Sequence, residues 1–326
     1  MIELAKNHKL SKTNSTFGIS EKLQEVMCLV GQSQVFADGE ALFSEMMGIS
    51  VCGKQIQRVS EYYGQQLEET EAKSIKEGTP APLVGNGKDI TYVMPDGSML
   101  FTRENGWQEI KVARIFPQSD NIPIQKNRKE ITGNLFVCHL GGLQGFLKKL
   151  EHYADDYKKK VCIADGAKWI WLWATATYPG MIQILDFFHV LEKLGNFASK
   201  QFVDEGIKQK WMSEQKERLL DNDVDEVIEI LAQLKGRNKE AEKLRIDVTR
   251  YYQNNKIRMQ YKTYLDAGFL IGSGPIESAH RNIVQQRLKL SGQRWSEKGA
   301  QQIVNLRACQ KGNRWSELVN LIKFAA

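Results

Sequence analysis

The spacing of apolar and polar residues divides the chain into a helical start, a strand-rich middle and a helical remainder. Apolar residues recur at helical spacing between residues 19 and 76. Alternation with a period of two then predicts strands over 90–94 with a continuation at 98–102, over 107–116 and around 135–139. Three strands in succession suggest an antiparallel meander.

The stretch from Val161 to Leu194 carries the most specific pattern. A short apolar run, Val161–Ala164, ends on Asp165, and a second run, Met181–Leu185, ends on Asp186. Runs of this length that are bounded by turn signals are typical of buried strands. With a helical pattern from residue 145 and another helix between the two runs, the predicted order is strand, strand, strand, helix, strand, helix, strand. This order predicts an α/β fold.

An acid at the end of a buried strand is a candidate for chemistry. Burying an unpaired carboxylate is unfavourable, and open α/β sheets place their sites at the carboxyl ends of strands. Asp165 is followed by a glycine, so it is also compatible with a simple turn. The repetition of this arrangement at Asp186, three residues before His189, favours a functional role.

Composition shifts define the expected domain boundaries. The clearest linker holds two prolines and three glycines, and the densely charged helical stretch after the second acid shows no strand-like alternation. We expect an N-terminal helical DNA-binding module (1–76), a linker (77–88), the first part of a catalytic core (89–194), a helical insertion domain (195–268) and the last part of the core with an acid-bearing helix (269–326).

The N-terminal module contains a possible helix-turn-helix. Two short amphipathic segments, 38–47 and 51–63, are separated by Gly48. In the functional interpretation, the polar residues of the second segment face DNA; these are Lys54, Gln55, Gln57 and Arg58. A helical hairpin that packs on the next domain fits the spacing equally well.

Composition restricts the compartment. The 326-residue chain is 42% hydrophobic but has no long uncharged apolar stretch, so we expect no membrane association. Its start lacks the apolar core of a signal peptide. Five scattered cysteines without a C-x-x-C pair favour a reducing cytosol over a disulfide framework or a thiolate zinc site. We therefore expect a cytoplasmic protein.

The net charge is modest, at +6, but basic residues cluster near the C-terminal end. Such clusters are typical of proteins that bind a polyanion, and a solvated basic surface fits as well. The residues concerned are Arg281, Arg287, Lys289 and Arg294.

Three acids from distant positions suggest a common site. Asp96 and Asp165 are each predicted to end a strand, and Glu277 to begin a helix after the insertion. Phosphodiester hydrolysis without a covalent intermediate needs an activated water and a stabilised leaving oxygen, and two Mg²⁺ or Mn²⁺ ions held by carboxylates supply both. Glu277 also fits a helix-capping role, because Gly274 and Pro275 precede it. His189 and His280 fit either catalysis or polar packing.

The ordered set of motifs resembles DDE transposases of bacterial insertion sequences, of the Kra type, with a layout similar to that of Mutator-class transposases. The resemblance runs from about Phe17 onward. It rests on GQSQVFADGEALFSEMMGISVCGKQIQRV (31–59), VMPDGSM (93–99), GWQEIKVARIF (106–116), ADGAKWIW (164–171), ILDFFHVLEKL (184–194) and GSGPIESAHRNIVQQRLKLSGQRWSEKGAQQIVNLRA (272–308).

The resemblance implies an α/β fold with all-α parts: a ribonuclease H-like, mixed five-stranded sheet with flanking helices, interrupted by the helical insertion. It makes Asp96, Asp165 and Glu277 the catalytic, metal-binding acids, with Asp186 and His189 in a supporting D-x-x-H element. The implied reaction is metal-dependent cleavage of double-stranded DNA at element ends, followed by attack of the freed 3′-hydroxyl on target DNA. By analogy, we expect a homo-oligomer on DNA in the bacterial nucleoid.

Other functions fit part of the pattern. Related transposases usually carry more sequence before the helix-turn-helix, often with paired cysteines, so we expect a shortened copy whose end-specific DNA binding is affected more than its catalysis. A ribonuclease H-like nuclease without strand transfer and a non-catalytic DNA-binding remnant or repressor are the alternatives. The choice of Asp165 over Asp186 as second acid rests on the resemblance, because both acids are predicted to end strands.

Overall fold

The computed structural model describes residues 16–125 and 128–324 and divides them into two compact units. The first unit contains the described residues up to 91, residues 96–158 and the C-terminal part from residue 276; the second contains residues 92–95 and 159–275. The chain thus enters the second unit briefly through one strand and later for a long continuous stretch.

Three helices open the first unit: α1 (Glu21–Ser33), α2 (Phe36–Met47) and α3 (Gly53–Glu77). The Ser20 hydroxyl accepts from the Leu23 N–H and so caps α1. Gly48, with φ 63°, ends α2 in the left-handed conformation that suits glycine. The helix expected to be the short second half of a helix-turn-helix is 25 residues long and continues far beyond the turn.

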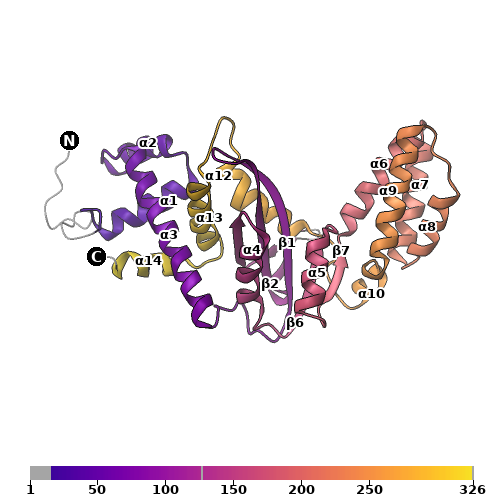
Figure 1. Ribbon diagram of the computed structural model, residues 1–326, viewed down its shortest axis with the longest axis horizontal. Helices are drawn as coiled ribbons and strands as arrows, with labels where there is room; N and C mark the ends of the chain where they lie inside the picture. Colours follow the sequence, from indigo (N-terminus) through magenta and orange to yellow (C-terminus); the bar gives the residue numbers. More distant parts are fainter. Residues whose placement is uncertain (1–15, 126–127, 325–326) are drawn as a thin grey trace. The chain divides into compact units, whose positions relative to one another are not determined.

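The long helix α3 packs along α13 (Glu297–Lys311), and α14 (Trp315–Phe324) covers another part of α3 (Figure 1). The approach of α3 to α13 depends on Gly64. A Cβ at this position would lie 2.2 Å from the backbone oxygen of Gln302. The two ends of the sequence are therefore folded into one helical layer of the first unit.

A five-stranded mixed sheet confirms the α/β prediction at that level. Its strands are β1 (Ile90–Thr102), β2 (Gly106–Pro117), β5 (Leu135–Leu140), β6 (Lys159–Ala164) and β7 (Ile182–Leu185). Their order is β5-β2-β1-β6-β7. β2 pairs antiparallel with β5, and β6 pairs parallel with β7. An additional two-stranded ribbon, β3 (Asn121–Gln125) with β4 (Arg128–Ile131), was not expected from the sequence.

The prediction that β1 ends at Asp96 is wrong, because β1 runs without interruption through Pro95, Asp96 and Gly97. The residues before this point, including Met94, are fully buried, and the strand continues to a buried Leu100. Gly97 does not form a turn but leaves room for a side chain of the neighbouring strand. A Cβ at this position would lie 2.3 Å from a carboxylate oxygen of Glu109. Burial along a long strand overrides the local turn propensity.

Two helices connect the later strands as predicted. α4 (Leu143–Ala154) packs on β2 and β5 in the first unit, and α5 (Lys168–Thr177) lies between β6 and β7 in the sequence. Trp171 and Trp173 of α5 are buried. Helical periodicity and apolar content were sufficient to predict both helices.

The stretch after β7 is helical throughout, with no strand between residues 195 and 268. Its helices are α6 (Phe187–Gln201), α7 (Glu205–Leu220), α8 (Val224–Gln233), α9 (Lys239–Asn255), the short 3-10 helix η2 (Lys256–Arg258) and α10 (Tyr261–Asp266). α6 packs on α7 and α9, and α8 packs on the same two helices (Figure 1). Among the described residues, no helix combines the length and apolar character needed to cross a bilayer.

Candidate active site

Asp165 and Asp186 follow neighbouring strands of the second unit. The last residues of β6 and β7, Ala164 and Leu185, are paired in register, and the Asp186 N–H donates to the Ala164 carbonyl at 2.9 Å. The prediction that each acid ends a strand is confirmed. Parallel strands bring these two carboxylates to the same edge of the sheet. Their roles must therefore be distinguished by the groups that surround each carboxylate.

Asp186 is 3% exposed, and protein groups occupy its carboxylate. One oxygen, Oδ1, accepts from the Phe188 N–H at 3.0 Å and caps α6. The Ser273 N–H donates to the same oxygen at 3.3 Å, and the Ser273 hydroxyl donates to Oδ2 at 2.6 Å. Asp186 therefore joins the start of α6 to the segment that leaves the helical stretch. This is a supporting role in structural terms.

Asp165 is half-buried, and its carboxylate accepts fewer hydrogen bonds than that of Asp186. Its Oδ1 accepts from the Ala167 N–H at 3.1 Å, which is the turn geometry expected of an Asp-Gly pair. Gly166 completes the turn with φ +100°, in the region that favours glycine. No ion pair with Asp165 occurs among the described Lys, Arg and His side chains. Asp165 is therefore a turn residue whose charge is not neutralised by a protein cation.

Tyr251 on α9 closes the space beside Asp165. Its hydroxyl donates to the Asp165 carbonyl at 2.6 Å. Burial raises the pKa of this phenol, and the charges of Asp165 and Asp186 raise that pKa further. The hydroxyl therefore stays protonated and acts as a donor. Sequence reasoning missed Tyr251, because a tyrosine in a charged helical stretch carries no signal of its tertiary partner.

His189 lies beside the same tyrosine. The rings of His189 and Tyr251 are 6.3 Å apart and nearly perpendicular, and His189 Nδ1 is 3.3 Å from the Glu192 carboxylate. Of the predicted supporting pair, Asp186 caps α6 and His189 lies in its first turn, and each side chain has its own partners.

In the first unit, Asp96 is tied to His280. The Nε2 atom of His280 is 3.2 Å from Asp96 Oδ2, within ion-pair distance, although the geometry does not satisfy a hydrogen bond. The Nδ1 atom lies 3.2 Å from the Ser98 hydroxyl, which Lys289 Nζ approaches to 3.2 Å from the other side. His280 is buried, whereas Asp96 is half-buried. The buried histidine therefore lies directly beside the Asp96 carboxylate.

The helix that carries Glu277 has an unusual continuation. α11 (Gly274–Ala279) places the exposed Glu277 in its first turn, as predicted. The expected long regular helix is then interrupted by the π-helical segment η3 (His280–Gln285) before α12 (Gln286–Leu288). Such π-helical turns inside helices are frequent at functional sites. Here the π-helical turn begins at His280, the residue that contacts Asp96.

The described residues contain no group of three or more His, Cys, Asp or Glu side chains arranged to hold a metal ion. The donor chemistry fits Mg²⁺ or Mn²⁺, since all three predicted ligands are carboxylates. However, Asp96 and Glu277 belong to the first unit and Asp165 to the second. The expected three-acid cluster thus stays a prediction for these residues.

The side chains of α3 that are predicted to contact DNA differ in their contacts within the protein. Lys54 and Arg58 are exposed, and the Arg58 guanidinium lies 5.4 Å from the centre of the Phe17 ring. Gln55 accepts from the Cys52 N–H at 3.1 Å and caps the helix, and Gln57 donates to Glu61 at 2.8 Å. The two cations are therefore better placed for phosphate contacts than the two glutamines.

The prediction that Arg287 contacts DNA is wrong. This residue is 1% exposed, and its guanidinium lies 4.7 Å from the ring centres of both Phe36 and Trp295. Its Nε donates to the Gly31 carbonyl at 3.0 Å, and burial lowers its pKa to about 10. The sequence pattern could not distinguish this core arginine from its exposed neighbours Arg281, Lys289 and Arg294.

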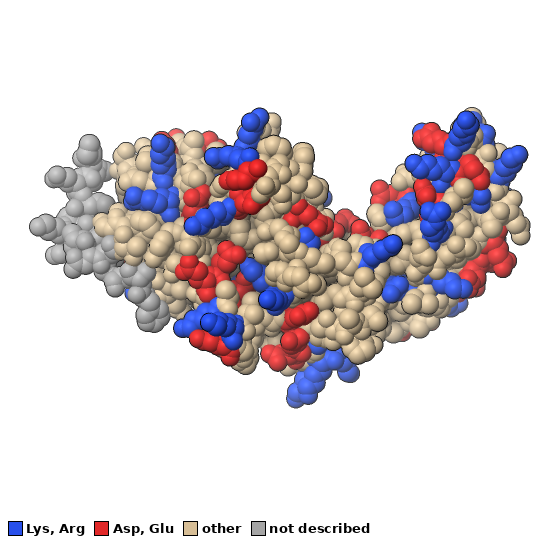
Figure 2. Space-filling view, in the orientation of Figure 1, with Lys and Arg blue, Asp and Glu red and all other residues tan. Residues whose placement is uncertain are grey.

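Charge is mixed over the visible surface. On the face shown in Figure 2, Lys and Arg side chains are interleaved with Asp and Glu side chains and do not form one continuous basic area. Contacts to a polyanion on this face would therefore depend on local groups of cations.

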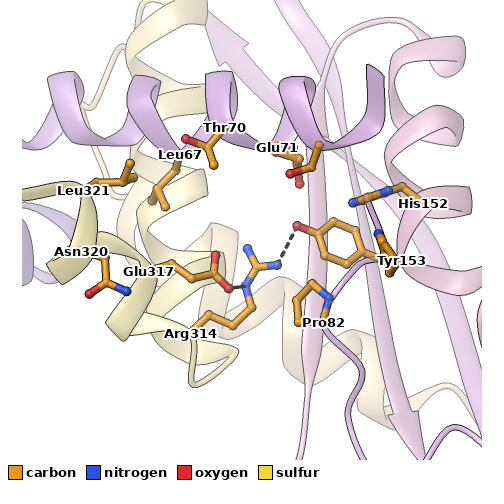
Figure 3. Close-up of a pocket in the computed structure, with 12 residues that line it drawn as sticks. Leu67, Thr70, Glu71, Pro82, His152, Tyr153, Arg314, Glu317, Asn320 and Leu321 are labelled. Carbon is orange, nitrogen blue, oxygen red and sulfur yellow. Dashed lines mark hydrogen bonds and ion pairs between the residues drawn. The ribbon is translucent and has the colours of Figure 1, made fainter. Parts of the chain in front are cut away.

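A pocket of about 300 Å³ lies elsewhere in the first unit, between α3, α4 and α14 (Figure 3). Arg314 donates to the Tyr153 hydroxyl at 2.6 Å across it, and Glu71 pairs with Lys149 at 2.7 Å. None of the predicted site residues lines it. Because its charges pair with one another, we interpret it as a polar junction between helices.

No model of a known protein family matches the chain, and no curated protein matches it.

Proposed function

We propose that this protein is a DDE transposase that cleaves DNA at insertion-sequence ends and joins the 3′-hydroxyl to target DNA. The observation that supports the proposal is the strand order of the mixed sheet. Asp96 lies in β1, Asp165 directly follows β6, and β1 and β6 are adjacent in the strand order. The sheet and its helices are compatible with the ribonuclease H-like layout that the sequence resemblance implies.

In this proposal, Asp96, Asp165 and Glu277 bind Mg²⁺ or Mn²⁺. When bound, these ions would activate a water and stabilise the leaving oxygen. His280 positions the Asp96 carboxylate from 3.2 Å away. Tyr251 and the left-handed Gly166 fix the backbone directly after Asp165. Asp186 contributes by holding α6 and Ser273 in place.

Double-stranded DNA is the proposed substrate. The exposed cations Arg281, Lys289 and Arg294 lie on or just after the helical stretch that carries Glu277 in its first turn. Phosphate contacts by such residues make affinity depend strongly on salt. The homo-oligomer expected on DNA belongs to the same proposal.

The test is a cleavage and joining assay on DNA that carries the sequences flanking this gene. We expect nicked and joined products with Mg²⁺ or Mn²⁺. Asp165→Asn should reduce cleavage about 100- to 1,000-fold, by analogy with the loss of a key transition-state interaction, and leave DNA affinity within about two-fold. The matched control is Asp156→Asn, at an exposed acid three residues before β6 begins.

Each outcome of this assay has a defined meaning. Cleavage that persists in Asp165→Asn contradicts the proposed chemistry. Cut products without joined products would identify a nuclease without strand transfer, and DNA binding without cleavage by the wild-type protein would identify a non-catalytic remnant or repressor.

A further inference from the structure

The far end of the β1–β2 hairpin exposes a group of apolar side chains. Trp107 is 65% exposed, Met99 46% and Phe101 39%. The rings of Phe101 and Trp107 are 5.5 Å apart and nearly perpendicular, at 81°. This edge-to-face contact holds the indole in place while much of it stays in contact with solvent.

The position of this group on the strand explains why it is uncovered. Along β1, Leu100 and Thr102 are buried, whereas Met99 and Phe101 alternate with them on the opposite side. β5 pairs with β2 only from Ile110 to Ile115, so it does not reach Trp107. The hairpin therefore extends past the strand that borders it and carries its aromatic pair beyond the core.

Cations without acidic partners border this hairpin end. Arg103 donates through Nε to the Arg294 carbonyl at 3.0 Å, and its backbone N–H donates to the Trp295 carbonyl at 2.9 Å. Figure 1 shows the hairpin end beside the loop that follows α12. Within residues 16–125 and 128–324, none of Arg103, Lys289 and Arg294 forms an ion pair. The three side chains are exposed.

The acids near the hairpin end contact other groups, and the Asp96 charge acts on Lys289 without forming an ion pair with it. Glu104 accepts from the Glu297 N–H at 3.0 Å, and Glu297 accepts from the Asn105 amide at 2.6 Å. Glu109 pairs with Lys111 at 2.6 Å. The hairpin end thus combines an exposed aromatic pair with exposed cations that form no ion pair in the part of the chain that the structure describes.

We propose that the Phe101–Trp107 pair stacks on unpaired bases of a DNA strand, while Arg103, Lys289 and Arg294 contact the adjacent phosphates. Aromatic side chains beside cations are how proteins bind single-stranded nucleic acid, since every base offers a π-face. A protein partner would have to leave the three cations unpaired or supply matching acids. The choice of DNA as the ligand rests on the proposed function. The stacking surface adds to that function that the substrate includes unpaired bases close to the cleaved ends.

The experiment measures binding of the full-length protein to a fluorescently labelled oligo-dT strand and to a duplex of equal length by anisotropy. Trp107→Ala should weaken binding to the single strand by at least about five-fold and leave binding to the duplex within about two-fold. Trp107→Phe should retain most of the affinity, because it keeps an aromatic face. Leu172→Ala removes an equally exposed apolar side chain, 72% exposed, from the second unit and serves as the matched control.

The proposed phosphate contacts are tested separately, through the salt dependence of binding. Arg103→Gln should reduce the slope of log affinity against log salt concentration by about 0.7 for the single strand, the value for one lost phosphate contact. Far-ultraviolet circular dichroism of each variant separates a lost contact from a lost fold.

Equal single-strand binding by wild type and Trp107→Ala would overturn the proposal. Loss of self-association in Trp107→Ala without any change in DNA binding would do so as well, and would identify the hairpin end as a contact between copies. Comparing cleavage by the wild-type protein with the effect of Trp107→Ala on single-strand binding separates this inference from the proposed function. If wild-type protein does not cleave DNA but its single-strand binding depends on Trp107, the stacking surface stands and the transposase proposal fails.

Discussion

At the scale of single residues, Asp165 and Asp186 show how surroundings separate two similar acids. Both follow buried parallel strands that pair in register. Asp186 accepts three hydrogen bonds from Phe188 and Ser273, whereas the Asp165 carboxylate accepts one from Ala167 and forms no ion pair in the described part of the chain. A buried acid whose oxygens all accept hydrogen bonds stabilises the fold, whereas an acid with an oxygen that accepts none can take part in catalysis.

We predict that Asp186→Ala destabilises the second unit by about 2–4 kcal/mol. The substitution removes the cap of α6 and leaves Ser273 without its acceptor. Asp165→Asn, in contrast, should shift stability by no more than about 0.5 kcal/mol. Urea unfolding followed by circular dichroism compares the two variants. Equal unfolding midpoints would contradict the division of roles.

A second prediction concerns pH and His139. Burial lowers the pKa of His139 to about 4, and the positive charges of Lys149 and Lys111 contribute to this decrease. Because the folded-state pKa lies below the unfolded value of about 6.5, the unfolded chain takes up the proton first. The neutral imidazole carries no penalty above pH 6.5, and stability falls as the pH decreases from there towards 4.

The partial exposure of His139 reduces the expected effect to about 1–3 kcal/mol. His139→Gln should lose less stability than wild type between pH 6.5 and 4, as measured by urea unfolding at a series of pH values. Parallel pH profiles for both proteins would show that His139 does not contribute.

At the scale of elements, burial patterns predicted more than local turn signals did. The order of β1, β2, β5, β6 and β7 with the helices between the later strands followed from apolar runs of the right length. The end of β1 was misplaced because Pro95-Asp96-Gly97 looks like a turn, yet Gly97 is needed to accommodate Glu109. The β3–β4 ribbon was missed because it is short, exposed and contains Pro123.

The sequence predicted only those site residues whose own place in the pattern is informative. The acids were found because strand ends and helix starts are visible in the sequence. Tyr251 and the burial of Arg287 were not found, because each depends on a partner far away in the chain, Asp165 and Phe36 respectively. Residue type and spacing do not encode such tertiary contacts.

The crossing of α3 and α13 gives a prediction at this scale. Gly64→Ala would place a methyl group 2.2 Å from the Gln302 carbonyl, so one helix must shift. We expect a loss of about 1–3 kcal/mol in the first unit. Gly180→Ala is the matched control, because a Cβ there meets no atom within 4 Å. Thermal unfolding of both variants should show a lower midpoint only for Gly64→Ala, and unchanged midpoints for both would contradict the close approach.

At the scale of the whole molecule, the proposed chemistry requires both units. Asp96 and Glu277 come from the first and Asp165 from the second. β1 contributes residues to both units. Each unit alone holds an incomplete set of the proposed ligands.

The most direct test of this account is a Mn²⁺ titration of the full-length protein, followed by electron paramagnetic resonance of the free ion. We expect saturable binding by wild type and by Asp156→Asn, and loss of at least about ten-fold in affinity in each of Asp96→Asn, Asp165→Asn and Glu277→Gln. If wild type does not bind Mn²⁺, or if any of the three substitutions leaves binding unchanged, the three acids do not share the ions and the proposed mechanism is contradicted.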